Sequence, residues 1–347
     1  MNLSFKKLKN FFSIPLSSSV GLDIGSSQVK MLELQKKEGK FCLINWGISE
    51  IKEDISEAVK QAMEGANPVK SPPRRGAAKS LFNRVNISLS GPEVIIRYVD
   101  LPKMSAEELE KSLKFEVEKY LPFKTEEMLF DWQVLSYSGQ NKMKVLLCAT
   151  KKNFAEERIK AVEKAGLTPK IVDIDTLCLV NSFYFNNFSE NKTVCLLNIG
   201  AITTNLNIVE KGESRLSRDI EIDGKEISQA SEQNAEGDSA EDKRIENNGE
   251  ENEKAVESVS PALETLLNET LRCFDFYESQ YEKGIEKICL SGGAANFVGV
   301  KKFLEEKIGI EAEIWNPLQS IQTQGFEELK ERKSEFAIAV GLAIRTC

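Results

Sequence analysis

The chain contains no histidine in its 347 residues. This absence excludes a Ser-His-Asp or Cys-His catalytic centre and any zinc site built on imidazole. The seven cysteines form no C-x-x-C pair, and most of them sit in apolar runs, which indicates buried free thiols in a reducing compartment. Any chemistry must therefore use carboxylates, lysine, hydroxyl groups, backbone amides or a bound metal ion.

Long hydrophobic runs and excess positive charge are also missing. No apolar stretch approaches the roughly 20 residues that a membrane-spanning helix needs. The net charge of −8 disfavours nucleic acid as a partner, because a polyanion requires clustered lysine and arginine. The length suits two domains with ample core.

The stretch from Ser19 to Leu34 predicts two strands joined by a tight turn. Apolar residues alternate before Gly25-Ser26-Ser27 and resume after it. Glycine lets a ligand approach the backbone, serine supplies hydroxyl groups, and backbone N–H groups of such a turn can bind phosphate. Asp23 could hold a hydrated Mg²⁺ ion. The alternative is an ordinary β-hairpin with a polar turn.

A second copy of this pattern lies between residues 194 and 209. Asn198-Ile199-Gly200-Ala201 repeats Asp23-Ile24-Gly25-Ser26, and an apolar strand stands on each side. An internal repeat is more specific than either copy alone. Two such hairpins facing each other could bind a triphosphate from two sides.

A third glycine motif follows a predicted strand at 285–290. Ser291-Gly292-Gly293-Ala294 leads from this strand towards a predicted helix through Val300. Paired glycines at a helix start allow the backbone to contact a flat or anionic ligand. The alternative is close packing between the strand and the helix.

Residues 81–173 predict the order β-β-α-β-β-α-β, which we interpret as a compact α/β insert with its own core. A capping box of Ser105 and Glu108 starts its first helix. A buried helix is predicted at 175–185, and an apolar helix at 336–344.

Three segments differ from the rest in composition. The basic, aromatic-rich residues 1–12 indicate either a terminus that frays or packs on the body, or a short helix on a membrane surface. Residues 65–79 predict a basic, proline-containing loop. Residues 225–257 hold eleven acidic and four basic residues and no aromatic residue, which predicts either a mobile loop or weakly ordered helices.

The order of the three glycine motifs resembles the actin-like ATPase superfamily, in which two phosphate hairpins and an adenosine motif surround a nucleotide between two domains. A closer resemblance is to the PilM family of type IV pilus assembly. It rests on the segments 101–109 (LPKMSAEEL), 116–123 (EVEKYLPF) and 336–345 (FAIAVGLAIR).

This resemblance implies an actin-like, ribonuclease H-like α/β fold with two domains and an extra subdomain of the kind found in PilM and FtsA. The implied parts are a tail at 1–16, a first lobe at 17–80, 174–193 and 335–347, the insert at 81–173, and a second lobe at 194–334.

The resemblance also implies a site for ATP and Mg²⁺, with Asp23 holding the metal through water. The residues expected to bind the nucleotide are Asp23, Gly25, Ser26, Ser27, Lys30, Asn198, Gly200, Ala201, Thr203, Thr204, Gly292, Gly293 and Ala294. The implied partner is the short cytoplasmic N-terminal peptide of a PilN-like inner-membrane protein, bound beside the insert. Other pilus or secretion platform proteins are further expected partners. The expected location is the cytoplasm, on the inner face of the bacterial inner membrane, with mainly indirect membrane contact.

Asn198 departs from the superfamily pattern, which usually has aspartate at that position. Asparagine is neutral and holds a cation less well, and the sequence identifies no catalytic base. We therefore expect a nucleotide-binding scaffold with weak or absent hydrolysis. An active ATPase or kinase is one alternative. A filament-forming relative of FtsA is another, although the chain ends directly after a core-like helix and so is expected to lack FtsA's amphipathic anchor.

Overall fold

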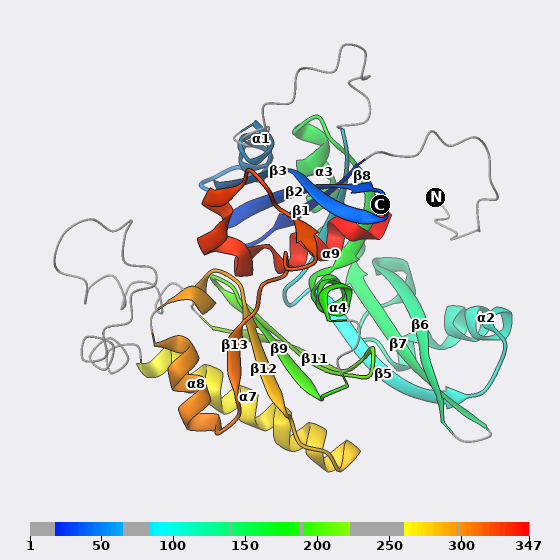
Figure 1. Ribbon diagram of the computed structural model, residues 1–347. Coiled ribbons are helices and arrows are strands. Elements are labelled where there is room, and N and C mark those ends of the chain that lie inside the picture. Colours follow the sequence, from blue (N-terminus) through cyan, green and yellow to red (C-terminus); the bar gives the residue numbers. More distant parts are fainter. Residues whose placement is uncertain are drawn as a thin grey trace.

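The computed structural model describes residues 18–64, 83–138, 141–187, 191–222, 260–297 and 299–346. They form two lobes, each built on a sheet, and a smaller subdomain beside them (Figure 1). The predicted tail at 1–16, the basic loop at 65–79 and the acidic segment at 225–257 lie outside the described residues.

The first lobe is built on a six-stranded sheet in the order β14-β3-β2-β1-β4-β8. Strands β1, β2 and β3 are antiparallel neighbours, whereas β4 runs parallel to β1 and β8 runs parallel to β4. The strands and the two helices on one face are β1 (Ser19–Ile24), β2 (Gln28–Lys37), β3 (Lys40–Glu50), β4 (Arg84–Leu89), β8 (Thr168–Ile174), β14 (Ile321–Gln322), α1 (Ile55–Glu64) and α3 (Lys152–Lys164).

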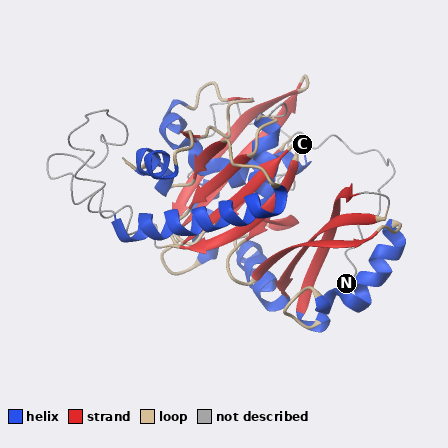
Figure 2. Cartoon of the chain, turned by 90° about the horizontal axis from the view of Figure 1, so that it is seen from below, coloured by secondary structure: helices blue, strands red, loops and turns tan. Residues whose placement is uncertain are grey.

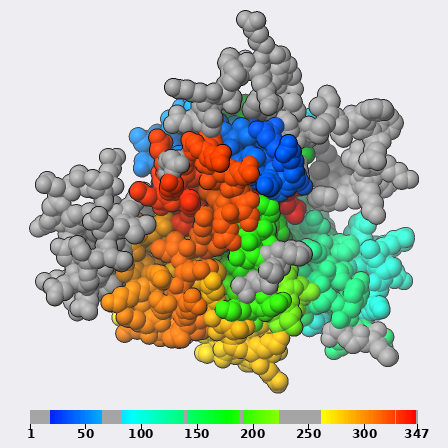
Figure 3. Space-filling model, in the orientation of Figure 1, coloured from blue at the N-terminus to red at the C-terminus, as the bar shows by residue number. Residues whose placement is uncertain are grey.

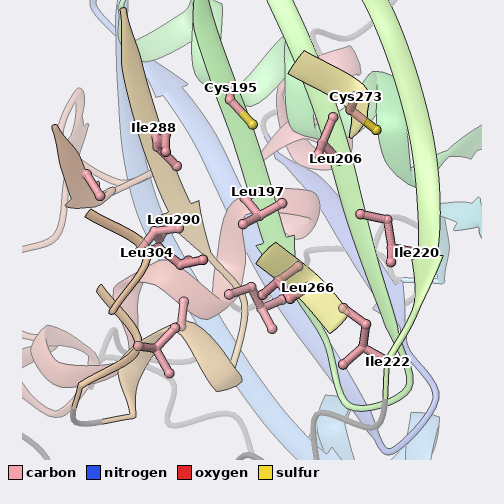
Figure 4. Close-up of a cluster of buried hydrophobic side chains, with 14 of the residues drawn as sticks. Cys195, Leu197, Leu206, Ile220, Ile222, Leu266, Cys273, Ile288, Leu290 and Leu304 are labelled. Carbon is pink, nitrogen blue, oxygen red and sulfur yellow. The ribbon is translucent and has the colours of Figure 1, made fainter. Parts of the chain in front are cut away.

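The second lobe repeats this arrangement in a five-stranded sheet, in the order β11-β10-β9-β12-β13. Again three antiparallel strands are followed by strands parallel to the first of them. Its elements are β9 (Val194–Ile199), β10 (Thr203–Glu210), β11 (Glu213–Glu221), α7 (Ser260–Tyr281), β12 (Lys287–Ser291), α8 (Val300–Ile308) and β13 (Ala312–Ile314). Leucines and isoleucines of the sheet meet α7 and α8 in one buried cluster (Figure 4).

Two helices lie at the junction of the lobes, α4 (Asp175–Asn186) and α9 (Ala337–Ala343). All seven residues of α9 are buried, and α4 contributes Leu179 and Phe183 to a cluster with strands of the second lobe. A Cβ atom on Gly341 would lie 1.9 Å from the carbonyl oxygen of Cys178. Glycine is therefore required where the two helices cross. Both helices were predicted from their apolar pattern, and their presence is confirmed.

The inserted subdomain is smaller than the sequence indicated. Its sheet contains only β5 (Val94–Pro102), β6 (Met128–Ser138) and β7 (Lys142–Lys151), covered by α2 (Ala106–Glu116). Strands β4 and β8 and helix α3 instead belong to the first lobe. The predicted insert at 81–173 was therefore too wide. Alternating apolar residues show that a strand has a buried face, but not which sheet the strand joins.

The capping box that starts α2 is confirmed. The Ser105 hydroxyl accepts a hydrogen bond from the backbone N–H of Glu108, and the Glu108 carboxylate accepts one from the backbone N–H of Ser105. The helix buries Leu109 and Leu113 against the three-stranded sheet. In the view from below, this sheet and its helix stand beside the two lobes (Figure 2).

The second lobe also ends earlier than predicted. Strand β14 pairs with β3, and Leu318, Ile321 and Phe326 pack in the core of the first lobe. The 3-10 segment η4 (Glu327–Phe336) then leads into α9. The chain therefore returns to the first lobe before residue 321, and the boundary expected at 334 was wrong. The surface view shows this returning segment, in orange and red, lying against the blue N-terminal strands (Figure 3).

Candidate functional site at the junction of the lobes

The two predicted phosphate hairpins have the same local structure. In the first, the N–H of Gly25 donates to the carbonyl of Gln28 at 3.0 Å; in the second, the N–H of Gly200 donates to the carbonyl of Thr203 at 3.2 Å. The residue before each Ile-Gly pair lies opposite a polar residue on the return strand, Asp23 opposite Lys30 and Asn198 opposite Asn205. The internal repeat seen in the sequence is therefore a repeat in structure.

Strand alternation turns Asp23 and Asn198 towards the junction of the lobes. Leu22 and Ile24 pack against α1 and α3, so Asp23 points to the opposite face. Gly21 on that face lies against α9, where an added Cβ would be 2.1 Å from the carbonyl oxygen of Ala339. Leu196, two residues before Asn198, packs against α4. Both polar side chains thus lie on the sheet faces that meet α4 and α9.

Asp23 is a buried carboxylate beside one cation. Its Oδ2 lies 3.5 Å from Nζ of Lys30. Burial raises the pKa of Asp23, and the Lys30 ammonium opposes part of that rise. A buried carboxylate is costly unless it is paired or coordinates a cation. Lys30 therefore supplies the positive charge that pairs with Asp23 in this buried position.

Asp175, which the sequence analysis did not single out, also belongs to this site. It is the first residue of α4, and its carboxyl faces the hydroxyl groups of Ser88 and Ser90, at the end of β4 and just beyond it, which lower its pKa. Burial raises the pKa of Asp175 to about 7, and the charge of Asp23 adds to the rise. Its position before an apolar helix was visible in the sequence, but its closeness to Asp23 is produced only by folding.

The second hairpin is joined to α4 by a hydrogen-bond network. The Asn205 amide donates to Oγ1 of Thr176 at 2.8 Å and to Oδ1 of Asp219 at 2.5 Å. Asn207 in turn donates to Oδ1 of Asn205 at 2.6 Å. The N-terminus of α4 therefore lies between the two hairpins. Its residue Asp175 is close to Asp23 of the first hairpin, and its residue Thr176 is hydrogen-bonded to Asn205 of the second. Free N–H groups at a helix N-terminus favour anions.

The glycine turn after β12 packs directly on the second hairpin. Gly292 has φ +89°, and an added Cβ would lie 2.4 Å from the carbonyl oxygen of Ile199. The hydroxyl of Ser291 donates to Oδ1 of Asn198 at 3.1 Å. An added Cβ on Gly293 would meet nothing within 4 Å. Packing against the second hairpin therefore requires glycine at position 292, whereas position 293 has open space beside its Cα.

Three details differ from the expected site. Thr204 is fully buried. It lies on the same face of β10 as Leu206 and Ile208, and that face packs against α7. It is not presented to the junction, whereas Thr203 is partly exposed. Ala294 is buried in the same core. The glycines are followed by a short 3-10 turn, Ala294–Asn296, and α8 begins only at Val300.

The remaining expected residues stand at the two turns. Ser26 is exposed, and Gly25, Ser27, Gly200 and Ala201 are partly exposed. Within the described ranges no three histidine, cysteine or acidic side chains converge as metal ligands. No described helix is long and apolar enough to span a bilayer.

The duplicated sheets, each with one phosphate-type hairpin aimed at the helices between them, define an actin-like ATPase fold with an extra α/β subdomain. The profile of the family described as type IV pilus assembly protein PilM matches residues 21–347. The chain therefore belongs to the PilM family, which confirms the resemblance seen in the sequence.

Solved structures agree on the fold. A chain of a PilM–PilN type IV pilus biogenesis complex is similar with a TM-score of 0.74 and 22% identity, over 94% of this chain and 98% of that chain. A diol dehydratase-reactivating factor in nucleotide-free form is similar with a TM-score of 0.52 and 9% identity, again over 94% and 98%.

Proposed function

We propose that this protein is a nucleotide-binding scaffold of type IV pilus assembly that binds ATP with Mg²⁺ between its lobes. The observation that carries the proposal is the position of the α4 N-terminus between the two hairpins, with the Gly292–Gly293 turn packed on the second. Backbone N–H groups of the turns at 25–27 and 200–203 would hold phosphate oxygens. Gly293 would lie against the base, and Asp23 would hold Mg²⁺ through water.

The charges of the site fit this ligand. Asp23 and Asp175 are close enough for the charge of Asp23 to raise the pKa of Asp175, so ionisation of both carboxyl groups creates a repulsion between them. A bound Mg²⁺ ion supplies the positive charge that offsets it. Lys30 lies beside Asp23 and would provide a cation near the phosphates.

Equilibrium dialysis with labelled ATP tests the binding, and no retention at millimolar nucleotide would refute it. Asn198→Asp restores the carboxylate that the superfamily usually carries and should strengthen Mg²⁺-dependent ATP binding. Asn45→Asp on β3 adds the same charge far from the hairpins and should leave the affinity unchanged. If Asn198→Asp also leaves it unchanged, the second hairpin does not face the phosphates.

Hydrolysis is a second candidate function, which Asp175 specifically favours. A general base works best when its pKa lies near the operating pH, and the pKa of Asp175 is about 7. In that role Asp175 would accept a proton from an attacking water. A phosphate-release assay distinguishes the two functions. Turnover that Asp175→Asn abolishes, without loss of ATP retention, identifies an ATPase; retention without turnover in the wild-type chain identifies a scaffold.

We further propose that a PilN-like N-terminal peptide binds beside the inserted subdomain, placing this protein on the inner face of the inner membrane. Strand β8 is at the edge of its sheet, and an edge strand offers unpaired backbone groups to an extended peptide. The side chains of Val172 on β8 and Leu129 on β6 are 41% and 44% exposed. Asp131 of β6 raises the pKa of Asp173 of β8, so the two strands are close together.

Fluorescence anisotropy with the labelled PilN-like peptide tests this surface. Val172→Asp and Leu129→Asp should each weaken binding about tenfold or more, a loss of ~1.4 kcal/mol. The matched control is Phe276→Asp, which introduces the same charge at an exposed aromatic residue of α7. Equal effects of all three substitutions would argue against the surface.

A further inference from the structure

The inserted subdomain emerges from the first lobe but is also fastened to the second lobe. The hydroxyl groups of Tyr98 on β5 and Ser214 on β11 are 2.7 Å apart. Nζ of Lys144 on β7 donates to the hydroxyl of Tyr281 at the end of α7 at 3.3 Å and lies 5.2 Å from the centroid of that ring. Tyr98 is partly buried, and desolvation of its hydroxyl group raises its pKa well above the usual range, so the phenol keeps its proton and its hydrogen bond.

A third connection joins the insert to the phosphate hairpin. The backbone N–H of Gly91, in the turn that leads into β5, donates to the carboxylate of Asp219 on β11. The same carboxylate accepts from Asn205, the residue opposite Asn198. Asp219 therefore connects the second hairpin to the first turn of the insert.

This turn is held by a second carboxylate from the candidate site. The hydroxyl groups of Ser88 and Ser90, which precede Gly91 in this segment, face the carboxyl of Asp175 and lower its pKa. Asp175 responds to the charge of Asp23 and, more weakly, to that of Asp219. The segment 88–91 thus lies between two carboxylates, Asp175 at the start of α4 and Asp219 on β11.

Strands β5 and β11 are in contact near Tyr98 and near Gly91, and an open space separates them in between. Residues 94–97 of β5 and residues 217–219 and 221 of β11 line a cavity of about 340 Å³ with Gly91, Pro92 and Thr203. This space opens to solvent, so it separates the two strands along part of their length and leaves the subdomain room to shift against the second lobe. Both strands are at the edges of their sheets, and no ladder between the described strands joins them.

We propose that the contacts of Tyr98 with Ser214 and of Asp219 with Gly91 form a latch that couples nucleotide occupancy at the two hairpins to the position of the inserted subdomain. This inference rests on the proposed nucleotide function. Binding at the second hairpin holds Asn205 and Asp219, and through Gly91 it holds the start of β5. Linkage requires that the coupling be reciprocal, so releasing the latch weakens nucleotide binding by the same factor.

Two measurements on the full chain test the latch. A titration with Mg²⁺ and ATP gives the affinity, and amide hydrogen exchange reports on residues 94–97 with and without that ligand. We expect Mg²⁺·ATP to slow their exchange about fivefold or more, the lower end of typical allosteric coupling. Tyr98→Phe removes only the hydroxyl group and should abolish that slowing while weakening ATP about fivefold. The control Tyr137→Phe changes an exposed tyrosine of the same subdomain and should behave as wild type.

The outcomes separate the two proposals. No binding in the titration refutes the nucleotide function and the latch with it. Binding with unchanged exchange at 94–97 refutes the latch alone, as does a Tyr98→Phe variant that binds and responds like the wild-type chain. Since Phe retains the ring of Tyr98, and Ser214→Ala should reproduce the result from the other side, a general folding defect is distinguishable from loss of the latch.

Discussion

Replacing Asp175 with asparagine should stabilise the ligand-free protein, and the gain should grow with pH. The folded pKa of Asp175 is about 7, raised from 3.8 chiefly by burial and next by Asp23. A carboxyl group whose pKa is higher in the folded than in the unfolded state stabilises the folded state below its unfolded pKa. That contribution is lost as the pH rises through its folded pKa. Asparagine has nearly the same shape and keeps a side-chain oxygen facing Ser88 and Ser90, but it cannot ionise.

The size of the change in stability follows from the difference between the folded and unfolded pKa values of Asp175. One pKa unit corresponds to 1.36 kcal/mol, so ~3 units correspond to ~4 kcal/mol. This value is an upper limit, because Asp175 keeps some contact with solvent. Between about pH 5.5 and about pH 7, ionisation of the folded wild-type chain costs ~2 kcal/mol, and the cost is constant above that range.

Urea unfolding of both proteins without nucleotide, in the presence of a chelator, measures the difference. Asp175→Asn should exceed the wild type in stability by ~2 kcal/mol more at about pH 8 than at about pH 5.5. Asp275→Asn removes a charge from an exposed position on α7 and should change stability equally at both pH values. A pH-independent difference for Asp175→Asn would refute the raised pKa of this carboxyl.

Three further predictions concern the fold, each measured by the same urea unfolding at neutral pH. Gly292→Ala should destabilise by about 2 kcal/mol or more, because the new Cβ would meet a carbonyl oxygen and the φ of +89° is strained for alanine; Gly293→Ala, with open space at its Cβ, should cost under about 1 kcal/mol. Gly341→Ala should cost more than about 3 kcal/mol, because a Cβ would be 1.9 Å from the facing backbone, and a smaller loss would show that α4 and α9 can separate. Ser105→Ala should cost about 1 kcal/mol through loss of the cap, and no loss would mean that water replaces the hydroxyl.

Much of the fold could be predicted because its patterns are local. The alternation before Gly25 and Gly200 defines two hairpins, the capping box at Ser105 starts a helix, and the apolar residues 337–343 allow only a buried one. Sheet membership could not be predicted, since β4 and β8 have the same alternation that a strand of the insert would have. The early return of the chain to the first lobe depends on Leu318 and Ile321, whose partners lie far away in the sequence.

The sequence by itself determined the chemistry available to this protein: no imidazole, a repeated Ile-Gly turn, and asparagine in the second copy where the first has aspartate. It also carried enough of the family pattern for PilM membership to be expected. Only the tertiary structure decided which groups meet. It turned Thr204 into the core, placed Asp175 beside Asp23, and connected Asp219 to both the second hairpin and the insert. Strand alternation sets the face of a side chain, but the electrostatic neighbour of a carboxylate is set by elements that folding brings together from 150 residues away or more, as for Asp23 and Asp175.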